Sequence, residues 1–508
     1  MSIAARIGSS RGLFLSEQRL AQAGLVALVV LAIALRLEPI LVEPSAVWPD
    51  EIFQASEPAH RLVYGSGLVA WEFQLGVRSW LLPGVIAALM ELSRIVGDGP
   101  GYYLPLVGGS FAALAAAPVV CSFLWCRPLF GALGALLAAT AIAVAPELVY
   151  FGARTLSEVV AGHVLVIALY VLEPGYRVTS YRRLFIGGAL LGLVFVTRVQ
   201  LAPAVAVVAL WTNWRADRER VLAMLTGAAG LLIVAGILDA ITLGYPFASL
   251  WRYVVYNLYY GVSSTFGIEP WNYYLLGELG VWGGACATIL LLAALGASRI
   301  PLLLVVAVSI LATHSAIAHK EYRFIYPAVL LVIVLAGIGL AQIASWGMHR
   351  LRAASVSETV AASVCTTLAL IAWALASLMV WTGPTLASFR YSTHDNLRAA
   401  AFVARAPGLC GIGLYGLGGN DWAYSGGYTY FHRPLPMYWP KDAAALAAYA
   451  AGFDTLVYTE APPEGLGFTP QQCFGQVCVA RRSGGCAPLP MIEMPFPDPV
   501  ARPLDGNP

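Results

Sequence analysis

Long apolar runs separated by short polar connections dominate the chain from residue 20 to residue 382. Many runs reach about 20 residues, the length that a helix needs to cross the hydrocarbon core of a bilayer. The first run is too long for a cleavable signal, so we expect it to stay as an anchor. The pattern predicts about eleven transmembrane helices, at 20–41, 102–126, 129–149, 156–172, 184–200, 201–214, 219–242, 275–297, 299–318, 323–346 and 357–382.

The charges between the runs predict the topology. Arginines gather before the first run and in the connections 173–183, 215–220 and 350–352. Because cytoplasmic loops collect Lys and Arg, we expect these connections in the cytoplasm. The segment 43–101 holds seven acidic residues against three arginines, so it belongs on the opposite side. If its apolar run 79–96 crossed the membrane, the arginine-rich connection 173–183 would lie outside the cytoplasm. We therefore expect 79–96 to form an interfacial or re-entrant helix.

The composition changes after residue 383. Pro, Gly, Asp and Tyr become frequent, and the pattern predicts strands at 411–416, 454–459 and 476–480 and helices at 395–406 and 441–450. We therefore expect a membrane domain over 1–382, with outer loops 43–101, 147–157 and 243–274, and a small soluble α/β tail over 383–508. Four of the eight cysteines lie in this tail, which indicates disulfides in an oxidising compartment.

Composition narrows the class of protein. The chain of 508 residues is 59% apolar and 11% charged, against about 25% charged residues in soluble proteins, so a soluble cytosolic enzyme is excluded. A net charge of +2 creates no general field for nucleic acid, and we expect no nucleic-acid partner. Only two of the 30 basic residues are lysines. This bias indicates a GC-rich bacterial genome, hence the bacterial inner membrane, with the endoplasmic reticulum as the alternative.

The first outer loop carries candidate catalytic carboxylates. Asp50 and Glu51 follow the first apolar run, where water meets lipid. A partly desolvated carboxylate there has a raised pKa and suits a general base for a hydroxyl. The alternative is a solvated acidic loop that only sets topology. Glu72 and Arg78 lie further on beside Trp71, as part of a site or as a membrane-surface anchor.

Two further outer loops add candidates. Arg154 and Glu158 lie in or beside the second loop, although an acid is also favoured in a first helical turn for structural reasons. The third loop, 243–274, holds eleven aromatic residues. Tyr259, Trp271 and Tyr273 are candidates for stacking on sugar or polyprenyl chains. The alternative is the aromatic belt that membrane proteins place at the interface.

A cluster of ionisable residues, His319-Lys320-Glu321-Tyr322-Arg323-Phe324, separates two apolar runs. Such a cluster is expensive at a membrane edge and indicates function. Lys320 is a compact cation and Arg323 a planar fork, so both suit a phosphate that gains charge as it leaves. The alternative is a turn whose long side chains reach the interface. Within the runs, Arg36 and Arg198 are further candidates for a phosphate or carboxylate pocket, although an arginine at such a position is more often the partner of an acid on a neighbouring helix.

This cluster resembles the His-Lys-Glu-Glu-Arg-Phe motif of the ALG/PIG mannosyltransferases, membrane enzymes of the GT-C superfamily, with Tyr322 in place of the second Glu. Three other segments resemble the family in the same order, over roughly residues 20–345. They begin with Pro49-Asp50-Glu51, with Phe53-Gln54, Glu57 and His60. They continue with Trp71-Glu72-Phe73 and Gly76-Val77-Arg78-Ser79, and end with Phe266-Gly267, Pro270-Trp271 and Tyr273-Tyr274.

The resemblance implies a GT-C fold with its active site on the non-cytoplasmic face. It also implies a polyprenyl-phosphate sugar, usually mannose, as donor, transfer with inversion, and a lipid-linked or envelope glycan as acceptor. Asp50 or Glu51 would be the general base, with Glu51 the closer match, and Glu158 would orient the acceptor. Lys320 and Arg323 would bind the donor phosphate, held in place by His319 and Glu321.

Two functions other than sugar transfer are also compatible with the sequence. A carrier or flippase of lipid-linked sugars would line a path through the bilayer with polar residues, whereas here the charges gather on one face. A membrane scaffold acting through the tail would tolerate neutral residues at Asp50, Glu51 and Lys320. No resident cofactor is expected. The clustered carboxylates allow a divalent metal, but no spacing defines its ligands.

Overall fold

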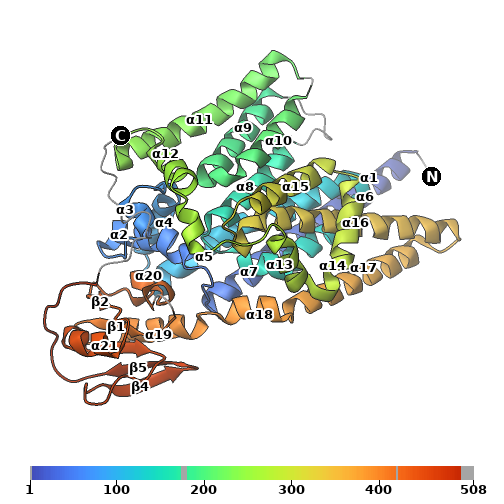
Figure 1. The fold of residues 1–508 in the computed structure, drawn as a ribbon. Helices are drawn as coiled ribbons and strands as arrows, with labels where there is room; N and C mark the ends of the chain where they lie inside the picture. Colours follow the sequence, from blue (N-terminus) through green and yellow to red (C-terminus); the bar gives the residue numbers. More distant parts are fainter. Residues whose placement is uncertain (1–2, 173–179, 215, 419–420, 493–508) are drawn as a thin grey trace. The chain divides into compact units, whose positions relative to one another are not determined.

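The computed structural model describes residues 3–172, 180–214, 216–418 and 421–492, so Arg177 and Arg215 of the predicted cytoplasmic connections lie outside the described residues. Figure 1 shows the helices and strands coloured along the sequence. The chain divides into two compact units. Unit 1 comprises residues 1–37, 109–235 and 267–387. Unit 2 comprises residues 38–108, 236–266 and 388–508.

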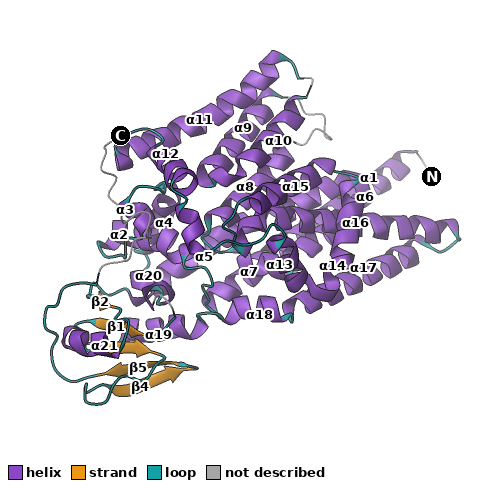
Figure 2. Cartoon of the chain, in the orientation of Figure 1, coloured by secondary structure: helices purple, strands orange, loops and turns teal. Residues whose placement is uncertain are grey.

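Unit 1 is built from helices (Figure 2). Its elements, some of which extend past its limits, are α1 (Ile3–Leu41), α5 (Pro100–Ala115), α6 (Ala117–Val144), α7 (Pro146–Gly152), α8 (Ser157–Leu172), α9 (Tyr181–Thr197), α10 (Ala202–Asn213), α11 (Arg218–Leu243), α13 (Tyr273–Trp282), α14 (Cys286–Ala297), α15 (Pro301–Ala316), α16 (Tyr326–Ala353) and α17 (Glu358–Trp381). Each of the eleven predicted runs is mainly helical, but the runs 102–126, 129–149 and 275–297 are each divided between two helices. Among the described residues, six helical stretches are long and apolar enough to cross a membrane, or seven if α7 and α8 form one bent span. The chain is a multi-pass membrane protein.

Helix α16 forms the core of unit 1. It packs against α6, α8, α14, α15 and α17, and most of its residues are buried. A helix that is apolar on all sides is expected at such a position. Its closest approach to α14 depends on two glycines, because a Cβ on Gly296 would lie 2.0 Å from the Leu335 carbonyl oxygen and one on Gly339 would lie 1.9 Å from that of Leu292. Larger side chains there would force the two helices apart.

Several helices break at or near helix-breaking residues of the sequence. Gly131 interrupts α6 with a φ of 73°, three residues after Pro128, which lies between the predicted runs 102–126 and 129–149. Helices α7 and α8 meet at an angle of 115°, so residues 153–156 turn the chain sharply beside Glu158. The predicted interfacial segment 79–96 contains α4 (Leu81–Ser93), which is shorter than a membrane span. Its interfacial position stays a prediction.

Unit 2 joins the first outer loop to the tail. Its helical elements are the π-helix η1 (Ile52–Ser56), α2 (Glu57–Tyr64), α3 (Trp71–Gln74), α4, α12 (Ala248–Val254), α18 (Pro384–Tyr391), α19 (His394–Arg405), α20 (Gly427–Phe431) and α21 (Ala443–Tyr449). Its strands are β1 (Ile412–Tyr415), β2 (Met437–Tyr438), β3 (Thr455–Tyr458), β4 (Thr469–Phe474) and β5 (Val477–Arg481). They form one sheet in the order β2-β1-β3-β5-β4, parallel from β2 to β3 and antiparallel from β3 to β4. The predicted α/β tail is thus confirmed.

The tail does not bury its core alone. Ile52, Phe53 and Leu68 of the first outer loop belong to the same buried cluster as Leu397, Ile412 and other tail residues. Two disulfides, Cys410–Cys486 and Cys473–Cys478, close the tail, as its cysteine content predicted. The remaining four cysteines are free thiols, two of them buried. The tail and the loop that carries the candidate base therefore form one packed body.

Candidate active site

The candidate base lies where a loop turns into a helix. Glu51 immediately precedes η1 and is 7% exposed, whereas Asp50 is half-buried. The backbone turns at Pro49, whose carbonyl accepts from the amides of Ile52 and Phe53 at 2.9 Å. A π-helix is rare and is frequently found at functional sites. Because η1 begins directly after Glu51, it supports a functional role for the dipeptide Asp50-Glu51.

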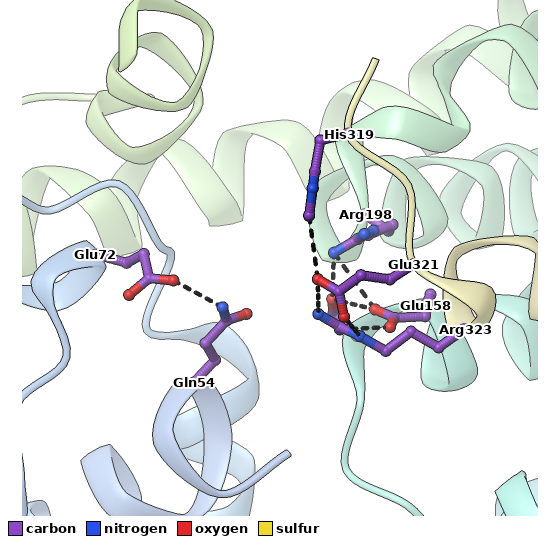
Figure 3. Close-up of polar contacts among 8 residues, drawn as sticks. Gln54, Glu72, Glu158, Arg198, His319, Glu321 and Arg323 are labelled. Carbon is purple, nitrogen blue, oxygen red and sulfur yellow. Dashed lines mark hydrogen bonds and ion pairs between the residues drawn. The ribbon is translucent and has the colours of Figure 1, made fainter. Parts of the chain in front are cut away.

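Glu72 lies near Asp50 within unit 2. Its Oε1 accepts from Gln54 Nε2 at 2.8 Å, a contact that is visible in Figure 3. Burial raises the pKa of Glu72 to about 7, the charge of Asp50 adds to this, and Arg78 and Gln54 oppose it. The structure thus brings together Asp50, Glu72 and Arg78, three residues that the sequence placed in two separate segments. A carboxyl group with a pKa near 7 can accept or release a proton at neutral pH.

In unit 1, Arg323 joins two acids that lie far apart in the sequence. Its Nε and Nη2 donate to the two oxygens of Glu321 at 2.8 and 3.1 Å, and its Nη1 donates to Glu158 Oε1 at 2.6 Å (Figure 3). Arg323 and Glu158 are almost fully buried. The planar guanidinium thus donates to both carboxylates at once, which a lysine ammonium cannot do in this geometry.

A second arginine completes the group. Arg198 Nη1 lies 3.3 Å from Glu158 Oε2 and donates to Ser157 Oγ at 3.2 Å. The guanidinium carbons of Arg198 and Arg323 lie 4.8 and 4.9 Å from the centre of the Phe324 ring. The sequence had identified Arg198 only as a secondary candidate, because nothing near it in the chain reveals its partner.

His319 and Lys320 lie beside this network. His319 Nε2 contacts Glu321 Oε1 at 3.2 Å, and its Nδ1 contacts the Gly267 carbonyl oxygen at 2.9 Å. Burial alone would lower the pKa of His319, but these two contacts outweigh it and raise the pKa. For Glu321, burial would raise the pKa, but Arg323 and His319 hold it well below its usual value. The pair therefore favours a charged carboxylate.

Lys320 differs from the arginines. Its Nζ donates to the backbone carbonyl oxygens of Glu269 at 2.8 Å, Ala318 at 3.4 Å and Ile317, while only 5% of the residue is exposed. Among the described residues, the ammonium group of Lys320 therefore contacts backbone carbonyl dipoles and no carboxylate. We call these six residues the cationic cluster: Glu158, Arg198, His319, Lys320, Glu321 and Arg323. Three permanent cations against two carboxylates leave it with a formal charge of +1 before His319 is counted.

A second buried network surrounds Tyr322, the position that departs from the family motif. Its hydroxyl donates to Glu147 Oε1 at 2.5 Å and lies 2.8 Å from Glu278 Oε2. Trp282 Nε1 donates to Glu147 Oε2 at 3.0 Å. In the sequence, Glu147 is an acid of the second outer loop and Glu278 a polar residue within a predicted run, but nothing in the chain joins either of them to Tyr322. The spacing of Glu278 and Trp282, four residues apart on one helix, was the available signal, but it does not reveal the distant partners.

The remaining predicted residues are distributed over both units. Arg154 is 1% exposed and stacks on the Tyr150 ring at 4.0 Å in unit 1. Trp271 is 69% exposed and Tyr273 half-buried in the same unit, whereas Tyr259, 80% exposed, belongs to unit 2. The exposed rings suit either an interfacial belt or stacking on a ligand, so their predicted role stays a prediction.

The described residues include one group of three close potential metal ligands, Cys410, Asp454 and Cys486. Its two thiols are joined as a disulfide and do not offer thiolates. Among the described residues this group therefore offers no thiolate ligands, and the divalent metal that the sequence allows stays a prediction.

The structure resembles two solved structures of another protein, ArnT. ArnT from Cupriavidus metallidurans in the apo state matches with a TM-score of 0.59 at 15% identity, covering 91% of this chain and 98% of that chain. The same protein bound to undecaprenyl phosphate matches with a TM-score of 0.57 and the same identity, covering 91% of this chain and 99% of that chain. At this identity the likeness establishes the fold, which confirms the predicted GT-C architecture.

Sequence relatives give a more specific result. GPI alpha-1,2-mannosyltransferase 3 of Danio rerio is 26% identical over 330 residues, covering 61% of this chain and 58% of that protein. GPI mannosyltransferase 3 of Yarrowia lipolytica is 28% identical over 318 residues, covering 62% of each. The match thus spans about three fifths of these relatives. The profile of the Alg9-like mannosyltransferase family matches residues 27–400, so the chain belongs to the Alg9-like mannosyltransferase family.

Proposed function

We propose that this protein transfers mannose from a polyprenyl-phosphate donor to a hydroxyl of a lipid-linked glycan, with inversion at the anomeric carbon. The observation that carries the proposal is the cationic cluster. Its buried arginines are held by Glu158 and Glu321, and Lys320 leaves an excess positive charge. Such a preorganised charge at the edge of the bilayer suits a lipid phosphate.

The donor phosphate gains charge as the glycosidic bond breaks, so a cation contributes most in the transition state. In the proposed reaction, the acceptor oxygen attacks the anomeric carbon from the face opposite the phosphate. The bond between that carbon and the phosphate oxygen breaks, and its electron pair leaves with the polyprenyl phosphate. Lys320 and Arg323 stabilise this leaving group, while Glu321 and His319 hold the arginine in place.

The proton of the acceptor hydroxyl requires a base. We assign this role to Glu51, with Asp50 as its neighbour, and a supporting role to Glu72 and Arg78. The raised pKa of Glu72 supports a local environment in which carboxyl groups exchange protons near neutral pH. Glu158 acts through the arginines that it contacts. Arg154 contributes to the acceptor side, and Tyr259, Trp271 and Tyr273 offer apolar faces to sugar or lipid.

The chemistry belongs on the non-cytoplasmic side of the membrane. The two tail disulfides support this, because disulfides persist in oxidising compartments. The curated relatives are GPI mannosyltransferases, so a GPI-like glycolipid is the first acceptor to examine. Their eukaryotic hosts favour the endoplasmic reticulum, whereas the arginine-rich composition favours the bacterial inner membrane. A carrier is not favoured, because the family is one of transferases.

The test uses purified protein in liposomes with radiolabelled undecaprenyl- or dolichyl-phosphate mannose and a glycolipid extract. The wild type is expected to move label to the extract. Glu51→Gln is expected to lower turnover about 10³-fold, since a general base contributes about 10²–10⁴. Glu91→Gln is the control, because Glu91 is an exposed carboxylate of the same loop paired with Arg94. Unchanged turnover in Glu51→Gln would contradict the assignment of Glu51 as the general base. If the wild type transfers no label from either donor, the proposal that the protein is a transferase is contradicted. Treatment with EDTA followed by Mn²⁺ tests for a metal.

A further inference from the structure

The stretch before Asp50 is attached to the tail. The contacts of this junction include four close to Asp50. Arg390 Nη2 donates to Glu43 Oε2 at 2.8 Å, and the Ala46 amide donates to Thr393 Oγ1 at 2.8 Å. His394 Nδ1 lies 3.0 Å from the Pro44 carbonyl oxygen, and the centres of the Trp48 and Phe389 rings lie 5.2 Å apart. All four lie within seven residues before Asp50 and arise from one short stretch of the tail, 389–394. The approach to the dipeptide is therefore held by the end of α18 and the start of α19.

The stretch after Glu51 is attached to the tail as well. Phe53 meets Trp422 edge to face, with ring centres 4.9 Å apart. Ile52 and Phe53 are 4% and 2% exposed and complete the buried core of the tail. These residues belong to η1, a π-helical turn of a kind that is rare in proteins. Their burial in the core of the tail packs this turn against tail residues.

The strongest contact lies at Glu57, six residues after Glu51. Its fully buried carboxylate accepts from the Thr429 amide at 2.5 Å and from Thr429 Oγ1 at 2.7 Å through Oε1, and from the Leu68 amide at 2.7 Å through Oε2. Gly427 permits this approach, because a Cβ there would lie 2.6 Å from the carboxyl carbon and its φ is +60°. Helix α20 is thus fitted to this one side chain.

We propose that the tail is a positioning element for the catalytic loop: it holds Asp50 and Glu51 from both sides through 389–394, Trp422 and Thr429. Glu57 and Thr429 are positioning residues that act through the backbone of η1 and touch no substrate. This inference rests on the proposed function, since it concerns the base of that reaction. It gives the tail, which lies mostly outside the matched region 27–400, a part in catalysis.

The variant Thr429→Val tests the contact, because it removes one donor to Glu57 and keeps the side-chain shape. Thr455→Val is the matched control: Thr455 is equally buried, but its hydroxyl donates to Asp454 within the tail. We expect Thr429→Val to lower kcat about tenfold, the loss of one hydrogen bond to a carboxylate, with the KM for the donor within about twofold. Thr429→Ser should restore kcat, and Thr455→Val should leave it unchanged.

Hydrogen exchange of the peptide 48–60 provides a readout that needs no turnover. Faster exchange in Thr429→Val than in Thr455→Val supports the attachment, and equal exchange overturns it. Wild-type kcat in Thr429→Val, or an equal loss in both variants, overturns the catalytic part. If the wild type transfers no mannose, the proposed function fails separately, and exchange alone then decides whether the tail holds this loop.

Discussion

Replacing Arg323 by lysine tests the fork at the centre of the cationic cluster. The guanidinium makes three hydrogen bonds to two carboxylates, at 2.6, 2.8 and 3.1 Å. A lysine keeps the charge but offers one compact ammonium, which can serve Glu158 or Glu321 and not both in this geometry. The substitution therefore isolates geometry from charge.

The size of the effect follows from the bonds that are lost. Each hydrogen bond to a charged group contributes about 1.5–3 kcal/mol, and a lysine loses at least one and more often two of the three. A loss of about 3 kcal/mol in the alignment of the phosphate site corresponds to about 100-fold in kcat/KM for the donor. Thermal stability should fall as well: an ammonium that faces Glu321 leaves the buried Glu158 with one cationic partner in place of two, and one that faces Glu158 leaves Glu321 without its guanidinium partner.

The assay measures initial rates against donor concentration, with thermal unfolding in the same detergent. Arg299→Lys is the matched control, because Arg299 is an exposed residue of unit 1 that donates to Gln342 at 3.1 Å. It should retain wild-type kinetics. A kcat/KM for Arg323→Lys within about threefold of the wild type, in folded protein, would refute the requirement for the fork.

Two further predictions concern buried carboxylates. Because burial raises the pKa of Glu57 from 4.5 to about 7, its contribution to stability is fully present below pH 4.5 and is lost as the pH rises to about 7. Relative to the wild type, Glu57→Gln should therefore gain up to about 3 kcal/mol across that window in pH-dependent thermal unfolding, and a constant difference would contradict this. Tyr322→Phe leaves Glu147 and Glu278 without their shared hydroxyl and should cost about 1–3 kcal/mol in thermal unfolding. An unchanged melting temperature would show that the bridge contributes nothing.

The sequence predicts the helices of unit 1 well, because runs of apolar residues at span length have few other solutions. It also predicts strands β1, β3 and β5, which are short buried apolar runs. It misses β2, which has two residues, and β4, whose Thr469–Phe474 segment is polar and mostly exposed. Such strands form through pairing with their neighbours and carry no hydrophobic pattern of their own.

The sequence likewise predicts one part of the candidate site and misses the other. The ionisable residues from His319 to Arg323 are visible as a local cluster, and motif resemblance suggests their roles. Their partners are not local: Glu158 is 165 residues from Arg323, and Glu57 is 372 residues from Thr429. Tertiary packing alone determines such contacts. For this reason the attachment of the first outer loop to the tail appears only in the structure.

The central claim is that Lys320 binds the donor whereas Glu51 acts only in the chemical step. Measuring donor affinity tests this claim most directly. Equilibrium binding of polyprenyl-phosphate mannose should be measured for the wild type, Lys320→Met and Glu51→Gln in one preparation, beside turnover. We predict at least about tenfold weaker binding for Lys320→Met, which loses the excess cation of the cationic cluster, and wild-type affinity without turnover for Glu51→Gln. Wild-type affinity in Lys320→Met, together with lost binding in Glu51→Gln, would contradict the account.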